Sequence, residues 1–365
     1  MSSDNVRAGD ESEPATTGMR AGGYYDEHSE YQARVAQSGA ALIDEVAGTA
    51  TLPEHGTFVL VDYGCSTGAN SIGAARTALS AVRKRRALQS VAVVHNDVVT
   101  NDFNELFANV ETRDDSYLTL DGPRPLVLGA ARSFFEPVVP TGSAHLGLSF
   151  SAAHWLRSQP AVDVPEGFYF SEATGEVRAV LAAEAAADWA TFLSARAEDL
   201  AAGGRLLVQM VGAHLEDGAE LVTARKLLEA MSETARELAG EGKLAASVVD
   251  RYILPVYART VEEAGAPLRE GGVLASRFAV DAIRTDPVTN PYLDQWRTDG
   301  DAAVYGRSYA AFVRGFTESN LREHLFAGND GLLDEYFDRL EARFAADPLA
   351  SPFEDWTLTI VLTRR

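Results

Sequence analysis

Apolar and polar positions along the chain follow two periods, one typical of buried strands and one typical of helices. Short apolar runs rich in branched side chains predict strands at residues 59–63, 91–97, 126–129, 144–150 and 205–211. Longer stretches with apolar residues at helical spacing predict helices at residues 24–46, 71–86 and 178–200. Strands that take turns with helices in this way predict an α/β fold, in which a mostly parallel sheet is covered by helices on both faces.

The first predicted strand ends in a loop of small residues, which is a candidate ligand site. Gly64 and Gly68 can take backbone angles closed to other residues and leave room for a ligand against the main chain. The next helix would present its positive end to that ligand, as in doubly wound proteins that bind cofactors there. An ordinary strand-to-helix turn explains the two glycines equally well. Their spacing differs from G-x-G-x-x-G, which speaks against a dinucleotide.

The second predicted strand ends in an acid, Asp97. A carboxylate at this place in a doubly wound sheet can accept hydrogen bonds from ribose hydroxyls. Asp97 can also be a turn residue or the cap of the following helix, because Asn and Asp suit both of these roles. The sequence leaves these readings open.

After about residue 216 the alternation stops, and helical stretches and loops follow until a last strand-like run at residues 356–362. We interpret the late helical material as a lid over the ligand edge of the sheet. The predicted division has four parts. They are a disordered segment at 1–22, a Rossmann-like core at 23–215 that begins with a substrate-capping helix, a mainly helical cap at 216–345 inserted between late strands, and a C-terminal strand at 346–365 that returns to the core sheet.

Composition narrows the class of partner. The chain has 365 residues and a net charge of −21, from 53 acidic and 32 basic residues. This charge repels phosphate backbones and anionic lipids, so we expect no nucleic acid and no membrane as partners. The chain has neither an apolar run of membrane-spanning length nor the start of a signal peptide, which predicts a cytoplasmic protein. The single cysteine, Cys65, excludes an internal disulfide and a cysteine-cluster metal site, and we expect no metal.

The chain carries several short motifs in a fixed order, namely Tyr25-x-x-x-Ser29-x-x-Gln32, residues 61–70, Asn96-Asp97-x-x-x-Asn101-Asp102-Phe103-Asn104, Ser133-Phe134-Phe135, His154-Trp155-Leu156 and Phe192-Leu193-x-x-Arg196-x-x-Asp199-Leu200-x-x-Gly203-Gly204-Arg205. In order and spacing, these motifs resemble those of the SABATH family, which are plant-type carboxyl methyltransferases that act on salicylic, benzoic and jasmonic acids and on some purine nitrogens. The resemblance covers roughly residues 23–363, and the ordered set is specific although each motif alone is weak.

The resemblance implies a class I methyltransferase fold, which is Rossmann-like and doubly wound, with a seven-stranded, mostly parallel sheet and a mainly helical cap. It also implies a homodimer that transfers a methyl group from S-adenosyl-L-methionine (SAM) to a small-molecule carboxylic acid, aromatic or aliphatic, and releases S-adenosyl-L-homocysteine (SAH). Asp97 would bind the ribose hydroxyls, and Asp62 and Asn70 would line the methionine end. The other implied cofactor-binding residues are Ser29, Gly64, Val98, Ser133 and Phe134, and the implied substrate-binding residues are Tyr25, Gln32, Ser151, His154 and Trp155.

The chemistry of this reaction agrees with the absence of a conspicuous catalytic acid or base. A carboxylic acid with a pKa of about 4.3 is already ionised at neutral pH, so its oxygen can attack a methyl sulfonium in line without losing a proton. The implied catalytic residues are Gln32 and Trp155, whose N–H groups can orient a carboxylate without neutralising it. Taken alone, Gln32 could instead cap a local backbone group and Trp155 could be part of the core.

Two positions depart from the family pattern. Ser151 stands where members with aromatic substrates usually carry a tyrosine, and His154 stands where an apolar residue is common. Together they predict a wider and more polar pocket wall, so salicylate itself is not implied. His154 either contacts a polar substituent of the acceptor or is a structural histidine. Three other functions stay open, namely methylation of a ring nitrogen or hydroxyl, SAM binding without catalysis, and dinucleotide oxidoreduction.

Overall fold

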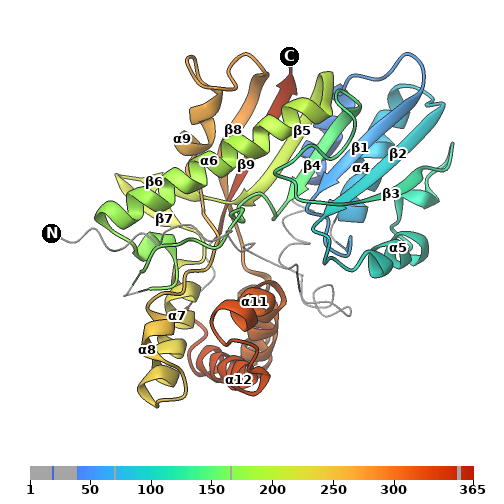
Figure 1. Cartoon of the computed structure of the whole chain (residues 1–365). Helices are drawn as coiled ribbons and strands as arrows, with labels where there is room; N and C mark the ends of the chain where they lie inside the picture. The colour runs from blue at the N-terminus through green and yellow to red at the C-terminus, as the bar shows by residue number, and fades with distance from the viewer. Residues whose placement is uncertain (1–18, 20–38, 70, 165–166, 352–354) are drawn as a thin grey trace.

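The computed structural model of the chain describes residue 19 and residues 39–69, 71–164, 167–351 and 355–365. Seven strands form one sheet in the order β3-β2-β1-β4-β5-β9-β8 (Figure 1). The strands β1 to β5 are Thr57–Tyr63, Ser90–Asp97, Leu126–Ala131, Ala144–Phe150 and Leu200–Val211, and β8 and β9 are Phe278–Val288 and Asp355–Arg364. Each apolar run that predicted a strand therefore lies in this sheet.

The direction of the strands is that of a doubly wound fold. Neighbouring strands from β3 to β5 are parallel, and β9 runs antiparallel to both β5 and β8. The strand order reverses between β1 and β4, and ligands of open α/β sheets bind at the carboxyl ends of the strands on either side of such a reversal. The predicted seven-stranded, mostly parallel sheet is confirmed, and its switch point lies where the glycine loop follows β1.

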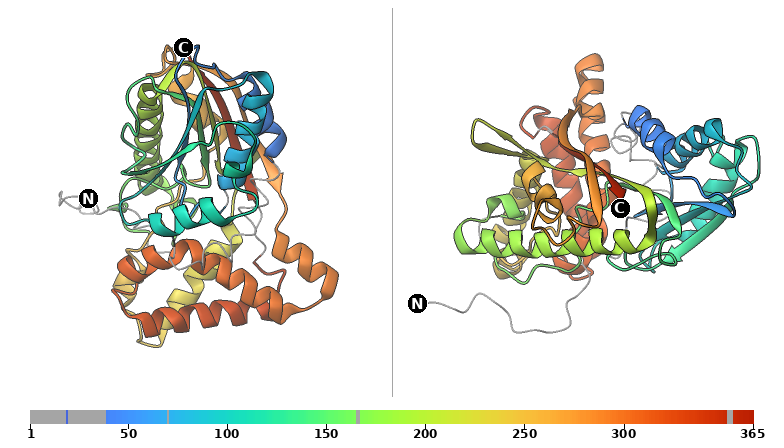
Figure 2. Two further views of the ribbon diagram at one scale, coloured as in Figure 1. Left: turned by 90° about the vertical axis from the view of Figure 1, so that its right-hand side faces the viewer. Right: turned by 90° about the horizontal axis from the view of Figure 1, so that it is seen from above.

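Helices cover both faces of the sheet (Figure 2). On one face, α3 (Ala40–Thr49), α4 (Ser71–Arg85) and α5 (Phe103–Thr112) share a buried apolar cluster with β1, β2 and β4. On the other face, the C-terminal half of α6 (Gly175–Asp199) packs against the sheet through Trp189 and Phe192. The N-terminal half of α6 instead joins a third cluster, outside the sheet. This long helix therefore connects the sheet to the remaining part of the molecule.

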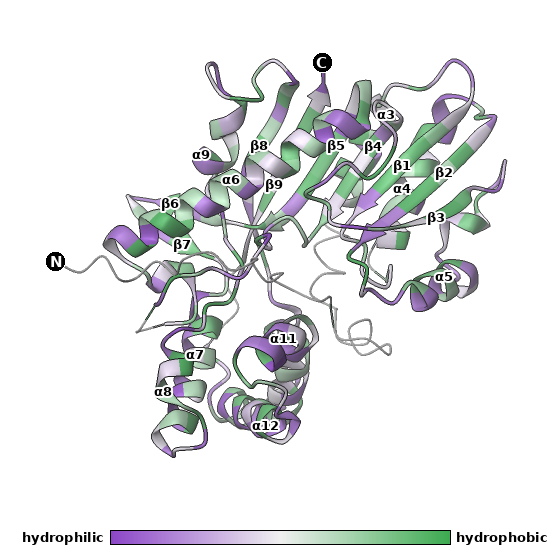
Figure 3. Cartoon of the chain, in the orientation of Figure 1, coloured by the Kyte–Doolittle hydropathy of each residue, from purple (hydrophilic) through white to green (hydrophobic). Residues whose placement is uncertain are grey.

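That remaining part is a mainly helical cap at the carboxyl ends of the parallel strands, in the lower half of Figure 1. Its helices are α7 (Arg225–Gly240), α8 (Ala246–Val249), α10 (Pro291–Asp299), α11 (Ala302–His324) and α12 (Asp330–Ala346). In Figure 3, β1 and β2 are apolar along much of their length, as strands buried on both faces should be, whereas α7 and α12 alternate between polar and apolar colours. None of the described helices combines the length and apolar character that a bilayer crossing requires.

Some elements differ from the sequence-based expectation. The stretch after residue 216 contains β8, and a hairpin of β6 (Ala213–Glu216) and β7 (Ala219–Val222) precedes α7. The pattern missed β8 because it is an edge strand with exposed polar positions such as Arg284 and Asp286, and such strands lack a continuous apolar run. A short helix, α9 (Val261–Gly265), contacts β8, and the described residues also contain three 3₁₀ turns at Tyr117–Thr119, Phe170–Glu172 and Ala266–Leu268.

The helix expected at residues 24–46 is described from Ala40 to Thr49, and its earlier part lies outside the described residues. The helix expected at 178–200 begins at Gly175 and ends at Asp199. The strand that follows begins at Leu200, five residues before the predicted start at Arg205. The four-part division of the chain stays a prediction.

Candidate active site

The loop between β1 and α4 is shaped by contacts that only glycine allows. Gly64 has a φ of +82°, and a Cβ placed on it would lie 2.3 Å from the Cβ of Ala152. Gly68 has a φ of +84°, and a Cβ placed there would lie 2.6 Å from the side chain of Leu106. Both positions therefore need glycine for their backbone angles and for the close approach of a neighbour. The first of these contacts also brings the glycine loop against the turn that follows β4.

Side chains and main chain after β2 hold this loop in place. The carbonyl oxygen of Asn96 accepts hydrogen bonds from Gly64 N at 2.8 Å and from Cys65 N at 3.0 Å. The amide of Asn101 donates to the carbonyl oxygen of Ser66 at 2.8 Å. Asn96 and Asn101 belong to a motif that carried the family resemblance, and the structure gives both of them a role in positioning the glycine loop.

Asp97 faces the same loop from the end of β2. Its Oδ2 accepts a hydrogen bond from Ser66 N at 2.7 Å, and its Oδ1 accepts one from Val98 N at 2.8 Å. Burial raises the pKa of Asp97 to about 6, against the opposing effect of the two backbone donors. Each oxygen keeps lone-pair capacity for a further donor. The cap of α5 is Asp102, which accepts from Glu105 N at 2.9 Å, so helix capping does not account for Asp97.

Asp62 lies in β1 and points into a buried polar group. Its Oδ2 is 3.2 Å from His95 Nδ1, and His95 Nε2 is 3.0 Å from the hydroxyl of Tyr117. The ligand atoms of Asp62, Cys65 and His95 lie within 4.8 Å of one another. Both ring nitrogens of His95 are already engaged, and burial raises the pKa of the Cys65 thiol, so these three residues are poorly arranged for a metal ion. The role of Asp62 at the methionine end stays a prediction.

Two hydroxyls at this edge of the sheet are buried and have no hydrogen-bond partner among the described residues, namely Ser66 Oγ and Ser71 Oγ. Ser66 also has a φ of +49°, which is uncommon for a residue other than glycine. Buried polar atoms normally have partners, so unpaired ones at a strained loop indicate a ligand. A carboxylate that can accept hydrogen bonds from a ribose diol, unpaired hydroxyls and a glycine loop are together a set of groups that fits SAM.

The segment after β3 places aromatic side chains beside the glycine loop. The Phe134 ring is half-buried, and its Cε1 would lie 3.7 Å from a Cβ placed on Gly64. The same ring packs edge-on against Phe192 of α6, with centroids 5.6 Å apart. The hydroxyl of Ser133 accepts a hydrogen bond from Phe135 N at 3.2 Å. Phe134 therefore lies next to the loop, and the contact of Phe134 and Ser133 with a cofactor stays a prediction.

A buried ion pair in α6 holds this aromatic segment. Arg196 and Asp199 are fully buried, with 2.9 Å between Nη2 and Oδ2. Arg196 also donates to the carbonyl oxygens of Phe134 and Glu136, and Asp199 Oδ1 accepts from Val138 N at 2.9 Å. Sequence comparison alone gave Arg196 and Asp199 no role. The structure assigns both of them to the support of the cofactor edge.

The turn after β4 carries the candidate acceptor residues. Ser151 has a φ of +50°, and its N–H donates to the carbonyl oxygen of Gln209 at 2.8 Å. Trp155 forms an isolated bridge with Val256, and the carbonyl oxygen of His154 accepts from Tyr257 N at 2.9 Å. The turn is thereby tied to β5 on one side and to a segment of the cap on the other. Because Ala152 contacts Gly64, it also forms the joint between the two halves of the site.

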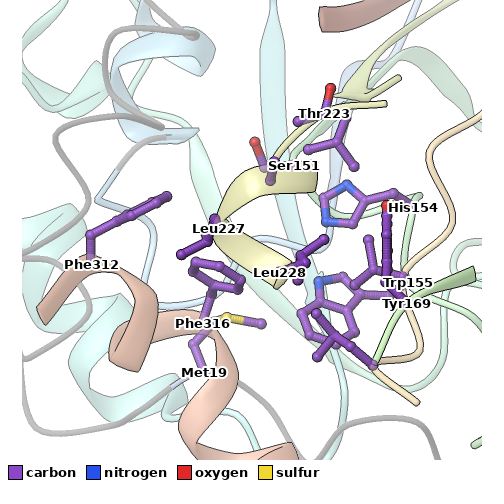
Figure 4. A pocket seen from close by; sticks show the side chains of 14 residues that line it. Met19, Ser151, His154, Trp155, Tyr169, Thr223, Leu227, Leu228, Phe312 and Phe316 are labelled. Carbon is purple, nitrogen blue, oxygen red and sulfur yellow. The ribbon is translucent and has the colours of Figure 1, made fainter. Parts of the chain in front are cut away.

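Ser151, His154 and Trp155 line one pocket (Figure 4). In Figure 4 the rings of His154 and Trp155 stand on one side, and Leu227 of α7 and Phe316 of α11 stand on the other. The remaining lining residues are Met19, Tyr169, Val211, Thr223, Ala224, Leu228, Leu254, Val256 and Phe312. The walls are therefore mostly apolar, and most of the apolar side chains come from the cap.

Few polar groups in this pocket are free. His154 is 7% exposed, and its Nδ1 has no hydrogen-bond partner among the described residues. Burial, together with the charge of Arg259, lowers the pKa of His154 to about 3, so the imidazole is neutral at physiological pH. No described residue accepts a hydrogen bond from the indole N–H of Trp155. The hydroxyl of Thr223, in contrast, donates to the carbonyl oxygen of Gly212 at 2.6 Å.

Four predicted site residues, Tyr25, Ser29, Gln32 and Asn70, lie outside the described residues. The described ones fall into two groups in contact, with the cofactor candidates around the glycine loop and the acceptor candidates around the pocket. Sequence reasoning missed the pocket walls from α7 and α11. Their apolar side chains follow ordinary helical spacing, which gives no signal that distinguishes a pocket wall from a core.

Comparison with known proteins gives a consistent result. A family model described as SAM dependent carboxyl methyltransferase matches residues 15–365. The O-methyltransferase acrG of Aspergillus aculeatus is 30% identical over 330 residues, which cover 84% of this chain and 85% of that protein. The loganic acid O-methyltransferase of Catharanthus roseus is 28% identical over 346 residues, or 88% of this chain and 86% of the relative.

The farnesoic acid carboxyl-O-methyltransferase of Arabidopsis thaliana is 28% identical over 257 residues, or 66% of this chain and 70% of the relative. A solved structure of a loganic acid methyltransferase with SAH is similar to this chain with a TM-score of 0.77. The match covers 95% of this chain and 98% of that one at 23% identity. At that identity, the likeness of the two structures establishes a shared fold.

Proposed function

The chain belongs to the family of SAM dependent carboxyl methyltransferases, and from this premise we propose which groups carry out the transfer and which acceptor they fit. The protein forms the methyl ester of a small carboxylic acid by direct in-line transfer. One observation carries the assignment of the site, namely that Gly64 of the glycine loop contacts Ala152 of the turn that presents His154 and Trp155 to the pocket. Cofactor and acceptor thus meet across a single contact.

The cofactor half acts through fixed main-chain and carboxylate groups. When bound, SAM supplies an electrophilic methyl group on a sulfonium. Asp97 accepts hydrogen bonds from the ribose hydroxyls with the lone pairs that Ser66 N and Val98 N leave free. Phe134 contacts the cofactor beside Gly64, and Ser133 fixes the backbone of that segment. Asp62 and the residues Ser29 and Asn70 complete this half.

The acceptor half orients an anion and performs no proton transfer. The acceptor is ionised at neutral pH, so it needs no base, and a histidine with a pKa of about 3 would be a poor one. The indole N–H of Trp155 donates to the carboxylate, and the Gln32 amide is the second donor. The apolar walls of the pocket exclude water from the reacting oxygen, which strengthens both interactions.

The pocket lining supports an acceptor with a sizeable apolar body and one polar substituent. The body would lie against the leucine and phenylalanine side chains of α7 and α11. The substituent would form a hydrogen bond with the unpaired His154 Nδ1, because a buried ring nitrogen without a partner is otherwise costly. Acids larger than simple benzoates that carry a hydroxyl or another polar substituent fit this description. Farnesoic acid, which a relative methylates by its name, matches the apolar body and lacks the substituent.

The assay combines the protein with labelled SAM and a panel of benzoates, indole acids, cinnamates, medium-chain fatty acids and farnesoic acid. We expect label in at least one acid, in a product that mild base hydrolyses. A labelled product that survives base would indicate N- or O-methylation of a heterocycle or phenol, which is the alternative function. If no acid is labelled while SAH binds normally in calorimetry, the acceptor assignment is wrong.

We also propose that the protein is a cytoplasmic homodimer, a state that the family resemblance supports. Light scattering after size-exclusion chromatography tests the dimer, since a monomeric mass across the concentration range would exclude it. Fractionation of the source cells tests the location. The proposed division at residues 22, 215 and 345 is tested by limited proteolysis, in which cleavage should concentrate near those boundaries.

A further inference from the structure

Arg259 is a buried cation without a direct counter-ion in the described part of the chain. It is 2% exposed, and its guanidinium donates to the carbonyl oxygens of Ala153 at 3.3 Å and of Ala185 at 2.8 Å. The same group stands near the rings of Trp189 and Tyr257, at 5.5 and 5.7 Å from their centroids. No carboxylate of the described residues forms an ion pair with it. Buried charges in proteins are normally paired, so this cation calls for an explanation.

The two acids whose charges act on Arg259, Asp188 and Glu263, are engaged with other groups. Asp188 accepts a hydrogen bond from Arg157 N at 2.8 Å, and its second oxygen lies 3.6 Å from the Arg157 side chain. Glu263 accepts from the hydroxyl of Tyr257 at 2.7 Å and caps α9. Both acids reduce the loss of charge on Arg259 that burial causes, and its pKa is lowered only to about 10. The guanidinium therefore remains positively charged at neutral pH.

Arg259 stands directly behind the acceptor turn. Ala153, whose carbonyl oxygen it binds, lies between Ala152, which contacts the glycine loop, and His154, which lines the pocket. Its charge reaches the pocket wall, since it contributes to the low pKa of His154. Because that histidine is neutral, the turn at residues 151–156 itself carries no positive charge that could attract an anion into the pocket. Arg259 therefore contributes a positive field on the pocket side of the turn although it does not line the pocket. Arg178, whose charge acts on Tyr169 of the pocket, is paired with Glu220.

We propose that Arg259 makes the acceptor pocket selective for anions, by acting on a bound carboxylate through the turn at residues 151–156 without touching it. This inference rests on the proposed function, because it concerns the same acceptor site. A unit charge on the order of 10 Å away changes the binding of an anion roughly tenfold at an effective dielectric constant of about 20. The interaction vanishes when the carboxylate becomes a neutral ester, so it favours binding of the acid over retention of the product.

This role predicts a split between kinetic parameters. The attraction acts on the carboxylate before the reaction, and the negative charge disappears as the methyl group is transferred. Loss of Arg259 therefore raises the KM for the acid and leaves kcat unchanged or slightly higher. A residue that only held the turn in place would instead lower kcat, because misplaced reacting groups slow the transfer.

The test compares an acid with its neutral amide in the full-length, SAH-bound protein. The probe is the acid of the panel that raises the melting temperature most, together with its primary amide. In Arg259→Gln, and in Arg259→Met as a second charge-free variant that fills an apolar volume, affinity for the acid should fall about tenfold. Affinity for the amide should stay the same, and Arg259→Lys should keep most of the acid affinity.

Arg157→Gln is the matched control, because Arg157 follows the same turn but its side chain is 60% exposed. It should leave the affinities for acid and amide unchanged. Equal losses of affinity for the acid and for the amide in the charge-free variants would overturn the inference. It would also be overturned if the wild-type protein bound acid and amide equally well, or bound no acid. If the charge-free variants lose acid selectivity but no acid is ever methylated, the inference stands and the proposed function fails. If acids are methylated but Arg259→Gln keeps the preference for the acid over the amide, the proposed function stands and the inference about Arg259 fails.

Discussion

The two halves of the site are built from different parts of the chain and by different means. The proposed cofactor half uses main-chain groups, glycines, short polar side chains and the ring of Phe134 from the ends of β1, β2 and β3. The acceptor half uses bulky apolar side chains from the turn after β4 and from α7 and α11, far apart in sequence. The first half is defined by backbone geometry and the second by side-chain volume.

This difference determines what each half can tolerate. A side chain at Gly64 would overlap Ala152, so the cofactor half has little freedom to vary. A leucine or phenylalanine on a helix can be exchanged for another apolar residue at moderate cost, which reshapes the pocket without moving the backbone. We therefore expect changes in the cofactor half to abolish activity and changes in the acceptor half to alter selectivity.

The largest expected effect is that of Asp97→Ala on the cofactor half. The change removes the proposed acceptor for the ribose hydroxyls and leaves Ser66 N and Val98 N without their partner. Loss of hydrogen bonds to a charged group costs about 3 kcal/mol, so SAH affinity in calorimetry should fall about a hundredfold. Asp115→Ala, at an exposed acid paired with Arg113, is the control and should bind SAH normally. Unchanged affinity in Asp97→Ala would mean that the ribose lies elsewhere.

A smaller effect is expected from Trp155→Phe in the acceptor half. Phenylalanine keeps an aromatic ring in the buried site but removes the indole N–H that we propose donates to the carboxylate. Loss of a donor to a charged partner costs about 1.5–3 kcal/mol, so kcat/KM for the acid should fall by one to two orders of magnitude. SAH affinity should not change. Trp296→Phe, at a partly buried tryptophan of the cap, serves as the control, and acceptor kinetics equal to wild type in Trp155→Phe would contradict the assigned pocket.

The affinity for SAH should depend on pH near 6, by about tenfold per pH unit, whereas the charge of the acceptor acid should not. Because the pKa of Asp97 in the folded protein is raised to about 6 from its ordinary 3.8, the carboxylate that we propose binds ribose becomes protonated as the pH falls through 6. Affinity for SAH should then drop about tenfold per pH unit below 6. An acceptor acid with a pKa of about 4.3 is still mostly ionised at pH 5. An unchanged affinity between pH 7 and pH 5 would refute the assignment of the titration to Asp97.

The raised pKa of Asp97 also makes the free energy of unfolding depend on pH. This stability falls as the pH rises, whereas the affinity for SAH rises. A carboxyl group whose pKa is raised on folding contributes stability that is fully present below its unfolded pKa and is lost as the pH rises through the folded value. For Asp97 this window runs from 3.8 to about 6. Asp97→Asn should remove both the pH dependence of SAH binding and this contribution, which urea unfolding at a series of pH values would measure.

The smallest expected effect is that of Phe316→Ala at the far wall of the pocket. Removal of the ring enlarges the pocket on the side of α11, opposite His154 and Trp155 (Figure 4). A methylene group is worth about 1 kcal/mol in an apolar pocket, so preference should shift severalfold toward longer acids. Competition between acids of two chain lengths measures this ratio. Phe107→Ala, at an exposed ring of α5, is the control, and an unaltered ratio in Phe316→Ala would remove α11 from the acceptor site.

The sequence predicts the cofactor half of the site better than it predicts the acceptor half. The strand ends, the glycine loop and Asp97 were predicted because local patterns of buried strands and positive-φ glycines are visible in short windows. The motif around Arg196 and Asp199 was visible, but its role was not, because the segment it supports lies about sixty residues earlier. The edge strand β8 was missed, since its exposed face carries charged residues.

The sequence by itself determined the α/β class, the loop that follows β1 and the family, because each of these depends on patterns or motifs within a few tens of residues. Only the tertiary structure decided what stands opposite the acceptor turn. Leu227 and Phe316 become pocket walls, and Arg259 becomes a charge behind the turn, through contacts between distant segments. The physical reason is that burial and electrostatic fields depend on distances in space, and the order of residues along the chain does not contain those distances.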